Sequence, residues 1–214
     1  MTEQAYKTPK IYAKISFAEK KSEFIGYIKP AASEKEAQGF LEEIRASNRK
    51  ANHNCWAYVI RSEIAAGGTT VRYSDDGEPS GTAGAPILDV LTKAGLTGAV
   101  CVVTRYFGGI LLGAGGLVRA YSKAASLAVS EAGIRTMSAA RKLCVTLEYP
   151  LYSKIERVFT SRGLHVESRD FSENVTLTLV VHDELADKFI QDLIESCNGA
   201  VVVEFIQNEY FDFG

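Results

Sequence analysis

Hydrophobic and polar positions along the first two thirds of the chain predict alternating strands and helices. An amphipathic helix is expected over Glu34–Ser47, with Ser33 as its N-cap and Glu36 as the capping-box partner. A second helix should begin near Pro86 and run through Lys93, and a third is expected over Leu117–Ala132. Apolar or alternating runs predict strands at Ile11–Phe17, Glu23–Lys29, Cys55–Arg61, Thr69–Tyr73 and Ala99–Arg105. This alternation favours an α/β sandwich.

The last third of the chain has a different pattern. Strict alternation predicts strands at Leu143–Tyr149 and Val175–Val181, and another strand begins near Leu164. One stripe at helical spacing lies between Tyr149 and Leu164, a second follows Val181, and a last strand is expected over Ala200–Ile206. The resulting β-α-β-β-α-β order is the ferredoxin-like order. We therefore predict an α+β protein with an α/β sandwich at residues 1–138 and a ferredoxin-like domain at residues 139–214.

Composition and charge narrow the function classes. The 214 residues are 46% hydrophobic and 23% charged, which is typical of a globular protein. A net charge of −2 excludes a protein that is basic throughout and coats nucleic acid by bulk charge. Residues 1–140 hold 17 Lys and Arg against 13 Asp and Glu, whereas residues 141–214 hold 7 against 13. A mildly basic first part and an acidic second part suggest two domains with different partners.

Cysteine usage and hydropathy indicate a reduced, cytoplasmic protein. The four cysteines are scattered without a Cys-x-x-Cys pair, so we expect small buried hydrophobes rather than zinc ligands. Residues Met1–Lys10 are polar with no apolar signal segment after them, and the apolar run Ile110–Val118 is too short to span a bilayer. We therefore expect no membrane association, and we expect no cofactor.

A glycine-rich loop between the predicted strand ending at Arg105 and the third helix holds the main candidate site. It is not a nucleotide-hydrolase loop, because Ala114 stands where that motif needs lysine, and the third glycine of a dinucleotide fingerprint is absent. Converging backbone amides and the positive end of a helix nevertheless favour an anion. Arg119 and Lys123 share one face near this helix N-terminus, where a cation costs about 0.3–1 kcal/mol. We therefore expect something negative beside them.

Two sources of that negative charge remain open, and tight packing of the glycines without any ligand is the third alternative. Carboxylates of the acidic loop could pair with the basic residues, or an external anion such as an RNA phosphate could bind, and both hold if the acidic loop forms one rim of a basic groove. The predicted anion-binding residues are Arg105, Gly108, Gly109, Gly113, Gly115, Gly116, Arg119 and Lys123. The predicted rim residues are Asp75, Asp76, Glu78, Ser80, Thr82, His53 and Lys21.

The acidic loop also raises the question of catalysis. Asp75, Asp76 and Glu78 could hold a divalent cation or act as acid and base, but a solvated turn is the simpler interpretation. Ser80 is not in a nucleophile elbow, because Glu78 occupies the required glycine position, and the three histidines lack metal-ligand spacing. We therefore assign no catalytic residue and no metal. Trp56 and Tyr58 either stack on bases or pack in the core.

Four blocks of this sequence resemble the signature of the IMPACT family, in particular its bacterial YigZ-type branch. They are Lys21–Ile25, His53–Tyr58, Asp75–Gly84 (Asp-Asp-Gly-Glu-Pro-Ser-Gly-Thr-Ala-Gly) and Val103–Tyr121, and they fall within residues 15–125. The resemblance implies a first domain with the fold of the second domain of a small-subunit ribosomal protein, shared by domain IV of elongation factor EF-G. It implies a second domain like domain V of EF-G, and this pairing suggests binding to RNA or the ribosome.

The resemblance implies only part of the regulatory role that is known for eukaryotic members of the family. Eukaryotic relatives restrain the general amino-acid control pathway with the help of an N-terminal RWD domain, which we do not expect in this chain because the signature begins close to residue 1. Our leading hypothesis is a non-catalytic regulator of translation that binds RNA or the ribosome. The alternatives are an enzyme acting on a phosphorylated small molecule and a protein-interaction module whose C-terminal domain docks a partner chain.

Overall fold

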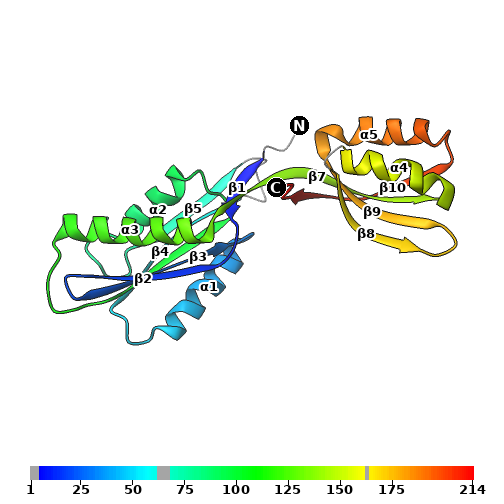
Figure 1. Ribbon diagram of the computed structural model, residues 1–214. Helices are drawn as coiled ribbons and strands as arrows, with labels where there is room; N and C mark the ends of the chain where they lie inside the picture. The colour runs from blue at the N-terminus through cyan, green and yellow to red at the C-terminus, as the bar shows by residue number, and fades with distance from the viewer. Residues whose placement is uncertain (1–4, 62–67, 162–163) are drawn as a thin grey trace. The chain divides into compact units, whose positions relative to one another are not determined.

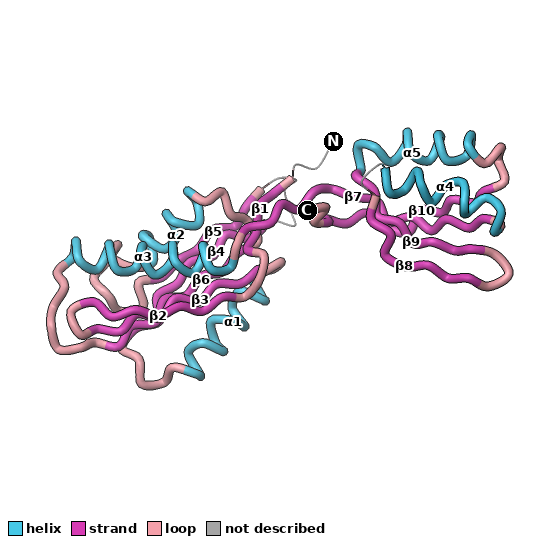
Figure 2. Tube along the Cα trace, viewed as in Figure 1, coloured by secondary structure: helices cyan, strands magenta, loops and turns pink. Residues whose placement is uncertain are grey.

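The computed structural model describes residues 5–61, 68–161 and 164–214 and divides the chain into two compact units (Figures 1 and 2). The first unit covers Tyr6–Arg135 and the second covers Thr136–Gly214, whereas the sequence placed the division between residues 138 and 139. Each unit is built on an antiparallel sheet with helices packed against it, so the protein is α+β.

The sheet of the first unit has the strand order β2-β3-β6-β4-β5, and every neighbouring pair is antiparallel. A short strand, β1 (Tyr6–Pro9), precedes it, and the carbonyl of Lys7 accepts a hydrogen bond from Thr97 N at 2.7 Å. The sheet strands are β2 (Ala13–Glu19), β3 (Ser22–Pro30), β4 (His53–Arg61), β5 (Thr69–Ser74) and β6 (Ala99–Tyr106).

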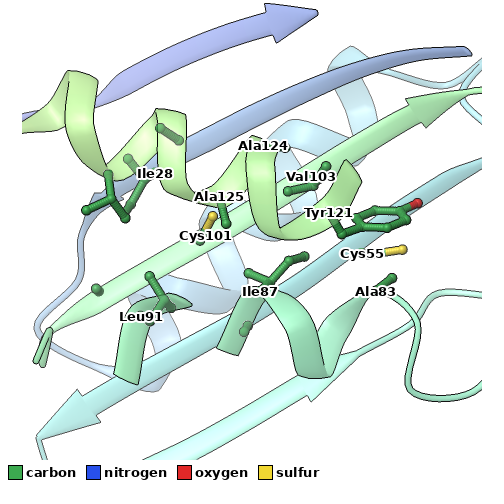
Figure 3. Close-up of a cluster of buried hydrophobic side chains, with 14 of the residues drawn as sticks. Ile28, Cys55, Ala83, Ile87, Leu91, Cys101, Val103, Tyr121, Ala124 and Ala125 are labelled. Atoms are coloured by element: carbon green, nitrogen blue, oxygen red, sulfur yellow. The ribbon is translucent and has the colours of Figure 1, made fainter. Parts of the chain in front are cut away.

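Helices cover both faces of this sheet. α2 (Gly84–Lys93) and α3 (Ala114–Ala132) lie on one face, and α1 (Glu34–Ser47) lies on the other (Figure 1). The alanines of α3 allow it to approach the sheet closely, and a Cβ on Gly26 of β3 would lie 2.7 Å from the carbonyl oxygen of Ala124. Apolar side chains from the sheet, α2 and α3 fill the space between them (Figure 3).

Two cysteines belong to this core. Burial raises the pKa of Cys55 and of Cys101 to about 12, so both thiols stay protonated and pack as small hydrophobic groups. Cys197 is also buried, whereas Cys144 is partly exposed. No cysteine pairs as a disulfide among these four.

Local sequence signals set the helix ends in two different ways. α1 spans its predicted range, and Ser33 Oγ accepts a hydrogen bond from Glu36 N at 3.2 Å. α3 begins at Ala114, three residues before the predicted start, so Gly115 and Gly116 form its first turn instead of the preceding loop. The sequence analysis places both glycines in the loop, but the packing of the later residues of α3 overrides the low helix propensity of glycine.

The second unit has the β-α-β-β-α-β order that the sequence predicts. Its elements are β7 (Ile134–Leu147), α4 (Tyr149–Ser161), β8 (His165–Phe171), β9 (Val175–His182), α5 (Asp183–Ser196) and β10 (Val201–Phe211). Among strands β7 to β10, the order is β10-β7-β9-β8, with all three pairings antiparallel. Alternate residues of β7 and β9 pack against Phe189 and Leu193 of α5 to form the core of this unit.

Candidate functional site

The end of β6 places Arg105 in a buried ion pair. Its Nη1 donates to Glu78 Oε1 at 2.6 Å, and the two side chains are 6% and 4% exposed. Tyr121 donates its hydroxyl to the same oxygen at 2.8 Å, and burial raises the pKa of Tyr121, which keeps that hydroxyl protonated. The guanidinium also lies over the rings of Phe24 and Phe107. The charge of Arg105 is therefore balanced inside the protein.

The other two carboxylates of the acidic loop also have internal partners. Asp75 accepts hydrogen bonds from the backbone amides at the start of α2, those of Gly81, Ala83 and Gly84, at 2.8–3.0 Å. Burial alone would raise the pKa of Asp75, but these three hydrogen bonds outweigh it and hold the pKa below its ordinary value. The acidic loop is thus a structural cap of α2 and not a solvated turn.

Asp76 fixes the position of the acidic loop beside β4. Its carboxylate accepts from Asn54 N at 2.6 Å and from Arg45 Nη2 at 3.1 Å. Asp76 and Gly77 both have positive φ, at 43° and 86°, and this left-handed turn reverses the chain before Glu78. Within the described ranges, no group of three His, Cys, Asp or Glu side chains is arranged to hold a metal ion.

A cleft of about 420 Å³ lies between the acidic loop and the glycine loop. Its polar lining includes His53, Glu78 and Arg105. Nδ1 of His53 lies 2.9 Å from the carbonyl oxygen of Asp76, which can only accept, so Nδ1 is the protonated nitrogen. Nε2 is then an acceptor in the neutral ring and lies 3.9 Å from Glu78 Oε1. The apolar lining consists of Pro79, Phe107, Leu111, Leu112, Ala114 and Leu117.

A second hollow of about 240 Å³, which we call the basic pocket, lies beside the first turn of α3. It is lined by Glu19, Lys20, Leu112, Gly116, Arg119, Ala120 and Lys123. Arg119 and Lys123 are exposed, and no carboxylate of the described residues lies within 4.0 Å of either cation. Lys123 Nζ instead lies 4.5 Å from the ring centroid of Phe17. The N-cap residue Gly113 supplies no side-chain cap to this helix.

The β2–β3 hairpin forms one wall of the basic pocket. Lys20 and Lys21 at its tip have φ values of 46° and 66°, so both adopt the left-handed conformation of a type I′ turn. Gly108 packs directly on this tip, because a Cβ at Gly108 would lie 1.9 Å from the carbonyl oxygen of Lys21. Gly108 N also donates to Ser22 Oγ at 3.2 Å. The glycine loop is therefore held against the hairpin.

The structure divides the predicted groove between two hollows. Arg105 and Gly113 line the cleft with the predicted rim residues His53 and Glu78, whereas Gly116, Arg119 and Lys123 line the basic pocket. The remaining predicted residues line neither hollow: Lys21, Asp75, Asp76, Ser80, Thr82, Gly108, Gly109 and Gly115. Thr82 turns its hydroxyl to the carbonyl of Pro79 at 2.6 Å.

Sequence reasoning missed several lining residues. The predicted site omits Lys20, which lines the basic pocket, although its place between two predicted strands beside another lysine is visible in the sequence. The predicted site also omits Phe107, Leu111 and Leu112, which line the cleft, and Leu111 is 82% exposed. The apolar run that contains Leu111 and Leu112 lies between glycines in a loop, and this pattern is the signal that could have predicted the cleft.

The aromatic pair on β4 belongs to the other face of the sheet. Trp56 and Tyr58 stack on each other, with ring centroids 5.4 Å apart and planes 9° apart. Tyr58 is buried, and its hydroxyl donates to Glu34 Oε2 of α1 at 2.6 Å. Of the two roles considered for this pair, the structure shows packing beneath α1.

The fold and its two hollows define a two-unit α+β protein with a basic pocket at a glycine loop, and sequence comparison gives the family. Residues 20–129 match the Impact N-terminal domain, and residues 145–200 match a domain of unknown function, DUF1949. The chain belongs to the IMPACT family. Among the described helices, none combines the length and the hydropathy that a membrane-spanning segment requires.

Bacterial relatives extend over most of the chain. It is 38% identical over 179 residues to the IMPACT family member YvyE of Bacillus subtilis, covering 84% of this chain and 81% of the relative. It is 31% identical over 182 residues to YigZ of Escherichia coli, covering 85% and 88%. A crystal structure of a hypothetical protein is similar at 28% identity and a TM-score of 0.61, covering 97% of this chain and 98% of that one.

Proposed function

We propose that this protein is a non-catalytic regulator of translation that binds RNA, as a free strand or within the ribosome, through the basic pocket. One observation carries the proposal: Arg119 and Lys123 have no carboxylate partner among the described residues, although three carboxylates lie on the neighbouring acidic loop. Those carboxylates are engaged by Arg105, by Arg45 and by the amides of α2. The carboxylates of the acidic loop are therefore not available to Arg119 and Lys123. An external anion is the remaining partner for these two cations.

The geometry of the basic pocket suits a phosphate group. Lys20, Arg119 and Lys123 surround it against the single carboxylate Glu19. α3 begins beside this pocket, where Gly116 lines it, and Gly113 supplies no side-chain cap, so the helix N-terminus adds a partial positive charge and backbone amides that have no partner within the helix. Phosphate oxygens accept hydrogen bonds from all three kinds of donor, and arginine binds them in bidentate fashion. An anion there would also relieve the repulsion between the helix dipole and the two cations.

The arrangement of the acidic loop favours binding over catalysis. A general acid or base must be within hydrogen-bond reach of the reacting group. Asp75 and Asp76 instead face backbone amides and Arg45, and neither lines the cleft or the basic pocket. This weakens the alternative of an enzyme that acts on a phosphorylated small molecule.

The two folds also support an RNA partner. We propose that the first unit is of the ribosomal-protein and EF-G domain IV type, and that the second is a ferredoxin-like domain comparable to domain V of EF-G. The antiparallel order β10-β7-β9-β8 with β-α-β-β-α-β connectivity is the basis for the second assignment. That pairing of domain types suggests a surface suited to structured RNA.

The test compares RNA binding by two charge-matched double variants. Arg119→Ala with Lys123→Ala removes two cations of the basic pocket, and Lys10→Ala with Lys35→Ala removes two exposed lysines elsewhere on the same unit. Fluorescence anisotropy with a labelled single-stranded RNA would be measured across a range of salt concentrations. Each lost phosphate contact lowers the slope of log K against log salt by roughly 0.7 for a single strand.

We expect the pocket variant to lose roughly 1.4 units of slope and the control variant to resemble the wild type. All four positions are exposed, so the melting temperatures should stay close to that of the wild type. Equal slopes and affinities for the pocket variant and the control would contradict the proposed function.

A further inference from the structure

The cleft beside the basic pocket carries hydrogen-bond acceptors that the protein itself does not use. Glu78 employs Oε1 for Arg105 and Tyr121, and its Oε2 has no partner among the described residues. Oε2 of Glu78 also remains accessible to solvent. Arg105 Nε, by contrast, is buried and has no hydrogen-bond partner. His53 Nε2 is the second acceptor that lines the same cleft. The cleft thus suits a ligand that presents two neighbouring N–H groups.

The charge and the walls of the cleft specify the ligand further. Arg105 already neutralises Glu78, so the pair offers no net charge to attract a cationic ligand, and a neutral N–H donor can satisfy Oε2. Phe107, Leu111, Leu112 and Leu117 form apolar walls around a space of about 420 Å³, within the range of small-molecule sites. A flat, neutral ring with N–H donors along one edge matches this combination.

Among the RNA bases, guanine has that edge. Its N1–H and N2 amino group lie side by side, whereas adenine and cytosine place an acceptor next to their amino group and uracil offers one N–H. Unpaired bases of RNA are commonly recognised by stacking and by hydrogen bonds to this Watson–Crick edge. Leu112 lines both hollows, so the cleft and the basic pocket adjoin at the first turn of α3.

We infer that the cleft binds an unstacked guanine base of an RNA strand whose backbone phosphate lies in the basic pocket. This inference rests on the proposed function and adds base selectivity to it. The cleft supplies acceptors and apolar contact, and the basic pocket supplies attraction that is independent of sequence.

The test uses mononucleotides with the full chain, so that base recognition is separated from binding of a polymer. GMP, inosine monophosphate and AMP would be titrated into the ¹⁵N-labelled protein and followed by amide chemical shifts. Inosine monophosphate keeps N1–H but lacks the N2 amino group. We expect GMP to bind most tightly, inosine monophosphate several-fold more weakly and AMP most weakly, with shifts at Gly77 and Ala114.

Three variants assign the effect to the cleft. Leu111→Ser removes an exposed wall residue, and His53→Phe removes an acceptor while keeping a ring of similar size. Ile110→Ser is the matched control, because Ile110 is also exposed but does not line the cleft. The first two variants should weaken GMP binding several-fold, whereas the control should not change it.

Equal binding of GMP and AMP, or unchanged GMP binding in both cleft variants, would overturn the inference. That result would leave the proposed function standing if the salt slope of RNA binding still depends on Arg119 and Lys123. Loss of that dependence would instead refute the proposed function, so the two failures are distinguishable.

Discussion

The buried ion pair between Arg105 and Glu78 permits a quantitative prediction about Glu78→Gln. Glutamine keeps the shape of the side chain and an oxygen that can accept from Arg105 and Tyr121, but it removes the negative charge. The guanidinium would then be a buried cation without a counter-charge, and its Nε already lacks a hydrogen-bond partner. Removing one member of a buried pair costs about 3–5 kcal/mol. For a domain of this size, that corresponds to a fall in melting temperature of roughly 10–20 °C.

Urea unfolding followed by tryptophan fluorescence would measure this effect. Trp56 is the single tryptophan of the chain and lies in the first unit, so its signal reports the unit that contains the ion pair. A double-mutant cycle with Arg105→Met isolates the interaction between the two side chains. We expect the double variant to be less destabilised than the sum of the two single variants.

A small decrease in the free energy of unfolding in the Glu78→Gln variant would refute this reasoning. If Glu78→Gln lowered the free energy of unfolding by less than about 1 kcal/mol, the pair would behave like an exposed salt bridge. The cleft would then have to admit enough water to solvate Arg105, in conflict with the 6% exposure of its side chain.

Further predictions concern one carboxylate and two glycines. Because the pKa of Asp75 is lowered in the folded state, its contribution to stability is present above the unfolded pKa and is lost as the pH falls through the folded pKa. Asp75→Asn should therefore lower the free energy of unfolding by about 1 kcal/mol at neutral pH, and the variant should lose less stability than the wild type as the pH falls. Urea unfolding at several pH values measures this, and an equal loss of stability in both proteins would contradict it. Gly39→Ala, with nothing within 4 Å of the added Cβ inside α1, should stabilise the protein by about 0.5–1 kcal/mol. Gly26→Ala should destabilise it by about 1–3 kcal/mol, because the Cβ would meet the backbone of Ala124, and similar melting temperatures for the two alanine variants would contradict both.

Local patterns in the sequence predicted the elements of this protein well, because each pattern depends on a few neighbouring residues. The capping pair Ser33 and Glu36 fixed the start of α1, and strict alternation in β7 and β9 revealed the strands of the second unit. The start of α3 was predicted too late, since glycine has a low helix propensity and nothing local shows that Gly115 and Gly116 are held in a helical turn.

The site could be predicted only in outline, because its pairings are between residues far apart in the chain. The acidic loop offers three carboxylates and the glycine region offers several cations, and sequence alone cannot choose among the pairs. Glu78 and Arg105 lie 27 residues apart, and their pairing depends on how β6 and the acidic loop meet in space. The division into two hollows likewise depends on where the side chain of Leu112 lies, which no spacing rule predicts.

The close packing of Gly108 on the β2–β3 hairpin has a thermodynamic consequence for any ligand of the basic pocket. The hairpin tip and the glycine loop contact each other directly, so little backbone entropy remains to be lost when a ligand binds. The entropic penalty then falls mainly on the rotamers of Lys20, Arg119 and Lys123, at about 0.5–1.5 kcal/mol for each side chain that becomes immobilised. A preorganised main chain with exposed cationic side chains favours rapid association and tolerates variation in the shape of the polyanion.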